Sequence, residues 1–488
     1  MVLAVCLALW GACADIAVVD EAPAAAAEAA PAPPPDLAAT SASARSEPPA
    51  GAARLGPGHT RVVWVQDTGD GTDFNSTGTQ LVLMGLDSED GFGEHPILST
   101  VSNYAKPLIT PAGDQVVFSN RPERSVYVVH WDGTGLRRLA GGFALEVWRD
   151  PGTGVDWVYA GTGEADTQAI SYHQVRRHRI DDPGEGELVW DRSPVSEDNF
   201  QLSADGRHAS GVFPWPNVGL ADLVSHRWDK LGEGCWTALS PGGPNLLWYF
   251  DGTHRNLTLV DTESDERWRI RISDAPGIDG FEVYHPRWSN HPRFLTMTGP
   301  YAVGDASNKI RGGGGRVEVY LGQFGEDFRT IEAWTQVTHN ERADFYPDAW
   351  IDPRVTDLPP VTPVVAVGDA APVAAPDLSR RVVLEASVLR AAPVPTPVSI
   401  APYREALLAL EYQVLEVIDG AYPLDTIVAA HWVIVEGAVL PGAERPTNRR
   451  YRLALDLYDD HPELEGRRLV LDADDVTLPL YYDASSRP

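Results

Sequence analysis

Short apolar runs separated by Gly, Asp and Pro turns dominate the hydrophobic pattern of this 488-residue chain. In Ser125–Trp131 (SVYVVHW), alternating side chains would place one strand face on a core and the other on a neighbouring sheet. The apolar run Gln115–Phe118 precedes it, and Leu136–Ala140 follows the turn at Asp132-Gly133. The stretch Ile109–Gly142 therefore predicts three successive strands. Because no helical period fits it, we expect an all-β fold.

Three motifs in this stretch recur in a known repeat. Pro111–Asp114 forms a turn, Phe118–Arg121 ends one strand, and Val126–Val128 stands in the next strand before an Asp-Gly pair. In these residues the stretch resembles the repeat of TolB-type β-propellers, a WD-repeat-like family, and the resemblance implies a propeller. Similar blade openings recur at a spacing of roughly 40 to 50 residues. The five predicted openings are Pro107–Ser119, Ala144–Ala160, Phe200–Phe213, Cys235–Phe250 and Tyr284–Thr298.

The two ends of this region complement each other. Asp344–Asp352 (DFYPDAWID) has the pattern of an innermost strand, yet no further blade follows it. Thr60–Gln66 and Gln80–Leu86 look like later strands that lack an innermost strand before them. Joining the two ends in one sheet completes a sixth blade and leaves no exposed edge. We predict a six-bladed β-propeller over residues 60–352, with seven blades as the alternative.

A second, smaller domain is expected after the propeller. Residues 353–379 form a linker rich in Pro and Ala, and residues 380–483 contain five predicted strands. The strand, Gly-containing turn and strand in Glu411–Ile434 resemble an OB-like or netrin-like fold, so we predict a small β-barrel. A short helix over Ile400–Leu408, capped by Ser399, should precede the second strand. The predicted strands are Arg381–Leu389, Ala409–Ile418, Thr426–Val435, Arg449–Leu457 and Arg468–Leu471.

The N-terminal pattern indicates export from the cytoplasm. Residues 1–14 contain one apolar run, Val2–Ala12, of about the length of a secretory signal and too short to cross a bilayer. Residues 15–59, rich in Ala, Pro, Ser and Glu, are predicted to form a disordered tether. Trp10–Cys13 resembles a bacterial lipobox, in which Cys13 would be lipidated. The alternative is cleavage after Ala14 without a lipid. Either way, we expect an extracytoplasmic location, in the periplasm, at the outer membrane or on the cell surface.

Charge and cysteine content narrow the class of function. The formal net charge of −30 makes nucleic acid an improbable partner, because such binding needs Lys and Arg on phosphate groups. With the signal removed, Cys235 is the one thiol of the folded part, so an internal disulfide framework is excluded. Because Cys235 begins an apolar strand, we expect a buried, inert thiol.

Polar and aromatic side chains are densest in Tyr284–Arg293. Four of these side chains can carry positive charge, and Arg forms paired hydrogen bonds with carboxylates and phosphates. Residues at the start of an innermost strand line the channel of a propeller, so we predict a positive patch at one mouth of an otherwise acidic molecule. The alternative is that Arg and Trp pack between blades and His caps a turn. The predicted ligand-binding residues are His285, Arg287, Trp288, His291 and Arg293.

The resemblance implies a binding or scaffolding module of the bacterial cell envelope. Its partner would be an envelope protein or an acidic glycan at the propeller mouth, with no cofactor. The alternative is a lyase or hydrolase of acidic polysaccharides, because some propeller lyases that act on oligogalacturonate have a histidine metal site. Such an enzyme needs an acid/base pair in one pocket, which the sequence does not reveal. A metal would combine His285, His291 and His339 with Asp344 or Asp348. Their spacing does not require this, so we predict no metal or catalytic residue.

Lipidation can be tested in the native host. If Cys13 carries the lipid, Cys13→Ser should move the protein from the membrane fraction to the soluble fraction, because one lipidated residue is the only predicted anchor. Quantitative immunoblotting of the two fractions measures the shift. Equal partitioning of the variant and the parent would exclude the lipid anchor.

Overall fold

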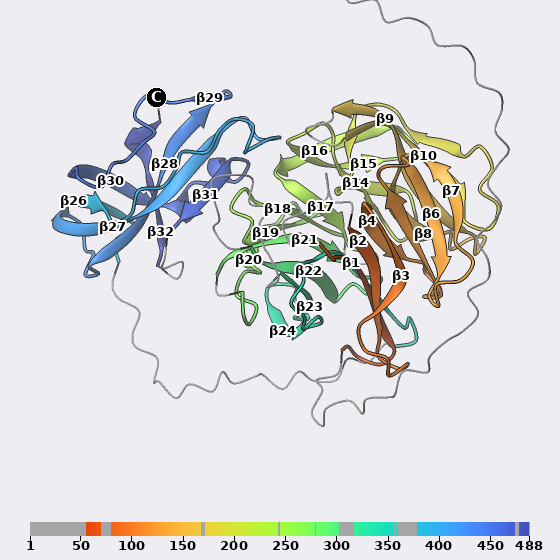
Figure 1. Cartoon of the computed structure of the whole chain (residues 1–488). Coiled ribbons are helices and arrows are strands. Elements are labelled where there is room, and N and C mark those ends of the chain that lie inside the picture. Colours follow the sequence, from red (N-terminus) through yellow and green to blue (C-terminus); the bar gives the residue numbers. More distant parts are fainter. Residues whose placement is uncertain are drawn as a thin grey trace, which may run out of the picture. The chain divides into compact units, whose positions relative to one another are not determined.

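The described part of the chain is almost entirely β-structure. In this computed structural model, it comprises residues 55–69, 80–166, 171–242, 245–278, 280–301, 317–355, 358, 378–473 and 478–487. Six sheets form the blades of a β-propeller and a seventh forms a second domain (Figure 1). The innermost strand of each blade contacts the innermost strands of both neighbouring blades, which closes a ring around a channel. The all-β class and the six blades predicted from the sequence are therefore confirmed.

The strands of each blade follow one another in the chain, except in blade 1. From the channel outwards, blade 1 contains β25 (Asp344–Ile351), β1 (Thr60–Asp67), β2 (Leu81–Asp87) and β3 (His95–Ser102). Blade 2 contains β4 (Tyr104–Ile109), β5 (Gln115–Asn120), β6 (Ser125–His130) and β7 (Arg137–Gly141). Blade 3 contains β8 (Phe143–Arg149), β9 (Asp156–Asp166), β10 (Ser171–Arg179) and β11 (Glu187–Trp190), with β12 (Val195–Ser196) also beside β10.

Blades 4 to 6 repeat the same order. Blade 4 contains β13 (Gln201–Leu202), β14 (His208–Val212), β15 (Asn217–Asp222) and β16 (Arg227–Glu233). Blade 5 contains β17 (Cys235–Leu239), β18 (Leu246–Phe250), β19 (Asn256–Asp261) and β20 (Arg267–Arg271). Blade 6 contains β21 (Glu282–Trp288), β22 (Phe294–Tyr301), β23 (Glu318–Phe324) and β24 (Ile331–Gln336).

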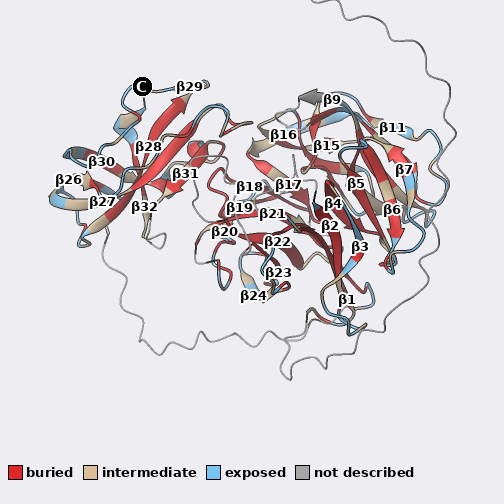
Figure 2. Cartoon of the chain, viewed as in Figure 1, coloured by how far each residue is buried: buried red, intermediate tan, exposed pale blue. Residues whose placement is uncertain are grey.

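Burial falls from the channel to the rim of the propeller. Every residue of β4, β22 and β25 is buried, whereas β3, β16 and β24 are mostly half-buried or exposed (Figure 2). The inner strands are covered on both faces by adjacent blades, so most of their residues are apolar, and their few charged side chains are buried. The outer strands contact a blade on fewer sides and therefore carry the charged residues.

The ring is closed by pairing between the two ends of the propeller chain. Strand β1 is antiparallel to β25 on one side and to β2 on the other, with Thr60 opposite Ile351 and Gln66 opposite Asp344. Two side chains of β1 reinforce the pairing, because Trp64 Nε1 and Gln66 Nε2 donate hydrogen bonds of 2.9 and 3.0 Å to Asp344 Oδ1. The closure predicted from the sequence is confirmed.

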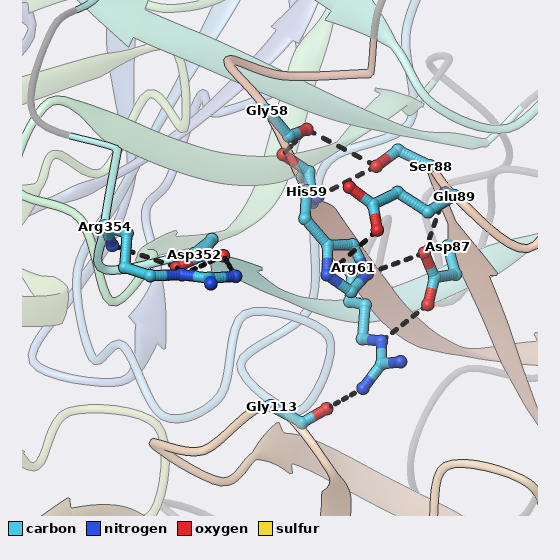
Figure 3. A network of polar contacts seen from close by, with 10 residues as sticks. Gly58, His59, Arg61, Asp87, Ser88, Glu89, Gly113, Asp352 and Arg354 are labelled. Carbon is cyan, nitrogen blue, oxygen red and sulfur yellow. Dashed lines mark hydrogen bonds and ion pairs between the residues drawn. The ribbon is translucent and has the colours of Figure 1, made fainter.

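A polar network holds the end of this closure (Figure 3). His59 Nε2 and Arg61 Nε lie 2.8 and 2.6 Å from the two carboxylate oxygens of Asp87. The Arg61 guanidinium also donates to the carbonyl oxygen of Gly113 and lies over the Trp131 ring, both in blade 2. Burial raises the pKa of Asp87, but the Glu89 N–H and Arg61 outweigh it, so the net pKa lies below its usual value. The network thus ties blade 1 to blade 2.

The second domain is a small closed barrel. Its closed ring contains β28 (Thr426–Val435), β32 (Leu480–Asp483), β30 (Tyr451–Leu457), β26 (Arg381–Val388) and β27 (Ala406–Asp419). Outside this ring lie β29 (Ala438–Val439), β31 (Arg468–Asp472) and the short 3-10 helices η3 (Tyr458–Asp460), η4 (Pro462–Leu464) and η5 (Ala484–Ser486). One apolar core fills the barrel, and a second core packs η3, η4 and β31 on the outside of β27 and β28.

Two details of the barrel differ from the prediction. The predicted helix over Ile400–Leu408 is absent: Ser399 closes a turn with Thr396 instead, and Leu407 and Leu408 pair with β28. Strand pairing here overrides the local helical pattern. The predicted fifth strand exists as β31, but it pairs in parallel with β27, and the ring is completed by the unpredicted β32.

The barrel contacts blade 5 and the start of blade 6. Arg468 of β31 donates two hydrogen bonds of 3.1 and 2.9 Å to the buried carboxylate of Glu282. Beside it, the Gly252 N–H donates to the Glu465 carbonyl at 2.8 Å, and the Leu469 N–H donates to the Gly252 carbonyl at 3.0 Å. A Cβ atom on Gly252 would lie 1.7 Å from the Arg467 carbonyl oxygen, so only glycine fits this contact.

The predicted signal, the tether up to residue 54 and Cys13 lie outside the described residues. No helix in the described part of the chain is long and apolar enough to cross a membrane.

The Asp87 network predicts a pH-dependent loss of stability. Asp87→Asn should lower the free energy of unfolding at pH 7 by about 1.5 to 3 kcal/mol, because it removes charge-assisted hydrogen bonds. A carboxyl group whose pKa is lowered by folding stabilises the fold at pH values above its ordinary pKa of 3.8. This stabilisation is lost as the pH falls from 3.8 through the lowered pKa of the folded state.

Urea unfolding of the parent and the variant between pH 7 and pH 3 measures this difference, which should shrink at the acid end. Asp182→Asn, at an exposed turn residue of blade 3, is the matched control and should have little effect. A constant difference across the pH range would contradict the ionic role.

Candidate functional site

Bulges in the innermost strands turn four side chains into the channel. Lys106, Trp236, His285 and Tyr346 have φ values of 47, 49, 56 and 50°. Each lies where the pairing of its innermost strand shifts register, as at a β-bulge. Proline follows three of them and cannot donate to the ladder, which suits an unpaired bulge position. The bulges therefore re-aim these side chains towards the channel.

These side chains line an inner chamber that is partly open and has room for about two water molecules. Its walls come from β4, β17, β21 and β25 and from the segment that leads into β13. The lining residues are Lys106, Pro107, Asp198, Phe200, Gln201, Trp236, Thr237, Ala238, His285, Pro286, Arg287, Tyr346 and Pro347.

Arg287 lies between two buried carboxylates, one from the neighbouring blade 1 and one from blade 3. Its NH2 group donates to both oxygens of Glu146 at 3.0 and 3.1 Å, and its Nε donates to Asp348 Oδ1 at 3.0 Å. Asp348 also accepts a hydrogen bond of 2.8 Å from the Ile109 N–H. Burial raises the pKa of Glu146 and of Asp348, and Arg287 opposes both shifts. One arginine thus joins blades 1, 3 and 6 across the channel.

A second ionic group lies deeper in the channel. Lys106 Nζ donates to the Glu197 carbonyl oxygen at 2.5 Å, and the Arg121 guanidinium forms an ion pair with the Glu197 carboxylate. Burial lowers the pKa of Lys106 to about 8. Burial and the neighbouring Glu197 carboxylate raise the pKa of Asp198 to about 7. The channel therefore contains two groups that titrate near neutral pH.

A wider mouth adjoins the inner chamber at Gln201 and Arg287. Its empty volume is about 900 Å³, and the Arg287, Glu146 and Asp348 side chains are among its lining groups. All six blades contribute to its wall through the ends of their innermost strands and the turns that follow, including Pro111, Trp148, Ser203, Pro241, Asn290 and Trp350.

The structure places the predicted ligand-binding residues in three different environments. His285 and Arg287 face the inner chamber, and burial holds the His285 pKa well below its usual value. Trp288 is fully buried, with its ring stacked on Trp248 at 4.2 Å. His291 and Arg293 occupy the turn after β21, where Arg293 Nε donates to the Phe324 carbonyl at 2.6 Å.

The four basic side chains therefore do not gather into one positive patch, and the positive charge of Arg287 is compensated. Their ligand-binding role stays a prediction. Sequence reasoning missed Lys106, Glu146 and Asp198 as channel residues. For Lys106 the one available signal was the X-Pro pair inside innermost strands, which recurs at Lys106-Pro107, His285-Pro286 and Tyr346-Pro347; no local motif marked Glu146 or Asp198.

The histidines of the metal alternative lie apart along the fold. His285 is in the channel and His291 is in the turn after β21, while His339 follows β24, with its N–H bonded to Glu94. Among the described residues, no group of three or more His, Cys, Asp and Glu side chains is placed to hold a metal ion.

Cys235 is buried, as predicted. Its Sγ lies 3.5 Å from the Tyr403 hydroxyl and 3.8 Å from His254 Nε2. Burial raises the pKa of the thiol to about 12, so it stays protonated and is a poor nucleophile.

Comparison with known proteins finds likeness only among solved structures. No protein-family model and no curated protein matches the sequence. TolB from Acinetobacter baumannii is 11% identical with a TM-score of 0.41, over 59% of this chain and 66% of that one. The putative TolB from Agrobacterium tumefaciens is 12% identical with a TM-score of 0.35, over 59% of this chain and 97% of that one. An oligogalacturonate lyase in complex with manganese is 14% identical with a TM-score of 0.28, over 43% of this chain and 61% of that one. At this similarity, the neighbours carry no information on activity, and the six-bladed fold rests on the sheets themselves.

The contacts of Arg287 predict that it stabilises the fold. Arg287→Met should lower the free energy of unfolding by about 3 to 5 kcal/mol, because it leaves two buried carboxylates without their cation. The loss should be smaller at acid pH, where both carboxylates become protonated.

Arg293→Met removes one hydrogen bond to the Phe324 carbonyl and a 3.5 Å ion pair with the exposed Glu332, and it should cost only about 1 to 2 kcal/mol. Chemical denaturation of both variants at pH 5 and pH 8 measures these differences. Equal, small losses at both positions would show that the channel network contributes little to stability.

Proposed function

We propose that this protein is an exported binding module of the bacterial cell envelope, which engages a protein partner at the wide mouth of its propeller. The observation that supports this proposal is the mouth itself, a hollow to which all six blades contribute. Clefts of this size with a few fixed polar groups are where proteins usually bind ligands.

A protein partner suits the mouth better than an acidic glycan. Arg287 is already shared by Glu146 and Asp348, so it has no charge to spare for a carboxylate of the partner. The wall instead contains the indole rings of the half-buried Trp148 and the buried Trp350, whose N–H groups already donate to the Ala204 and Pro111 carbonyls. Aromatic side chains fixed in this way are typical anchors of protein interfaces.

An enzyme is the second candidate, favoured by Lys106 and Asp198. Their pKa values of about 8 and 7 are those expected of an acid/base pair. However, the inner chamber that they line has room for only about two water molecules, too little for a sugar ring. A polysaccharide bound in the mouth would lie against the compensated Arg287 network instead. Binding therefore accounts for the geometry better than catalysis does.

The location in the envelope belongs to the same proposal. It is supported by the apolar N-terminal run, the Ala- and Pro-rich stretch after it and the lipobox-like Cys13. A tethered propeller would present its mouth to partners at a distance from the membrane.

Site-specific photo-crosslinking in the native host tests the proposal. A photoreactive phenylalanine at Ala204, exposed on the mouth, should give a discrete covalent adduct with an extracytoplasmic protein. The same residue at Ser225, exposed on an outer turn of blade 4, is the matched control and should give none.

Identical adducts at both positions, or none at Ala204, would contradict a partner at the mouth. Shortening of an acidic polysaccharide by the purified parent protein would instead support the enzyme.

A further inference from the structure

Three residues that line the inner chamber each carry a buried side-chain oxygen with the same property. Asp198 Oδ1, Gln201 Oε1 and Thr237 Oγ1 have no hydrogen-bond partner among the described residues. All three residues line the same chamber: Gln201 and Thr237 are 6% and 1% exposed, and Asp198 is half-buried with its Oδ1 atom buried. Buried polar atoms are nearly always paired, because leaving one unpaired costs free energy. Three in one small cavity indicate a group that is bound there.

The fixed charges around the chamber indicate the sign of that group. Lys106, Arg121 and Arg287 are its cations, and Glu146, Glu197, Asp198 and Asp348 are its carboxylates. Glu197 pairs with Arg121, and Glu146 and Asp348 share Arg287. No ion pair of the described residues joins Lys106 to Asp198. With all four carboxylates ionised, one negative charge is left over, so the chamber favours a cation or a proton.

We propose that the inner chamber binds a primary ammonium group, held by Asp198, Gln201 and Thr237. Such a group has three N–H donors, and the chamber offers three unpaired oxygen acceptors. Its single positive charge matches the one negative charge that is in excess around the chamber. Its size also fits a chamber with room for about two water molecules.

Other occupants fit these three oxygens less well. A quaternary ammonium group has the same charge but no N–H donor, so it would leave all three acceptors unpaired. A calcium ion takes six to eight oxygen ligands, of which the chamber supplies three with one carboxylate. Water would satisfy some of the oxygens but would leave one negative charge in excess around the chamber.

The ammonium group would compete with a proton on Asp198. Because burial raises the pKa of Asp198 to about 7, the carboxyl is largely protonated at pH 6 and ionised at pH 8. An alkylammonium ion stays charged over this range, so its affinity should rise about tenfold from pH 6 to pH 8. Arg287, Lys106 and Arg121 face Asp198 from other blades, and Lys106 begins to lose its own charge near pH 8, which acts in the same direction.

The test is a titration of the full chain with n-butylammonium chloride and with Nα-acetyl-lysine methylamide, followed by ligand-observed NMR. The first is a free amine, and the second presents the ammonium as a partner's lysine would. Tetramethylammonium, sodium and potassium chlorides at equal ionic strength are the competing cations. We expect the first probe to bind, and the second to bind only if a peptide can reach the chamber from the mouth.

Asp198→Asn should weaken binding at least tenfold, and Thr237→Val should weaken it several-fold. Asp229→Asn, at an exposed position on β16, is the matched control and should bind as the parent does. Equal melting temperatures would show that the variants remain folded.

The proposal is overturned if the parent binds neither amine, or if Asp198→Asn binds as well as the parent. It is also overturned if tetramethylammonium competes equally, which indicates an aromatic cage, or if sodium or potassium does, which indicates a metal-ion site. The inference does not depend on the partner at the mouth. Crosslinking at Ala204 without amine binding would remove this proposal alone.

Discussion

Pairing of β25 with β1 is the interaction on which the rest of the propeller depends. It joins segments that are nearly the whole propeller apart in sequence, and Asp344 binds both Trp64 and Gln66 across the joint. Only with β25 in place does Asp348 lie opposite Arg287 and complete the channel. Chamber, mouth and ionic network are therefore consequences of ring closure, and none of them can exist within a single blade.

The channel combines features that destabilise the fold with ion pairs that offset them. Bulges turn Lys106, Trp236, His285 and Tyr346 inwards at the expense of unfavourable backbone angles, and buried charges add a cost of desolvation. The mutual pairing of Arg287, Glu146 and Asp348 offsets much of that cost. Asp198 is the exception, since its Oδ1 atom is buried and has no hydrogen-bond partner among the described residues. A buried, unpaired carboxylate oxygen is tolerated where a bound ligand or a proton supplies the missing partner.

Sequence reasoning identified the features that every blade repeats and missed the channel contacts that occur only once. The turn motifs fixed the innermost strands, and the unmatched ends at Thr60 and Asp352 were enough to predict the sixth blade. Channel contacts could not be predicted in this way. Arg287 contacts Glu146 and Asp348 from two other blades, and a local sequence pattern does not show which distant residues meet in the fold. The predicted helix at Ile400–Leu408 failed for the opposite reason: its local pattern was helical, but pairing of Leu407 and Leu408 with β28 decided the outcome. Trp288 shows both limits. It was predicted to bind a ligand because of its neighbours in the sequence, and its burial between blades was only the alternative interpretation.

The closure has a mechanical consequence. The chain enters the ring at Thr60 and leaves it at Ile351, and these two residues lie directly opposite each other in an antiparallel pair. A pull between the preceding and the following segments would therefore act on β1 and β25 as on a zipper, loading one pair of hydrogen bonds at a time rather than all together. The first bond to meet that load is the one that the Asp352 N–H donates to the His59 carbonyl at 2.9 Å, next to the network of His59, Arg61 and Asp87. If the segment before the propeller is tethered and a partner pulls on the part after it, the tension would open β1 and β25 one pair of hydrogen bonds at a time. The charged network lies at the end of the two strands where this opening would begin.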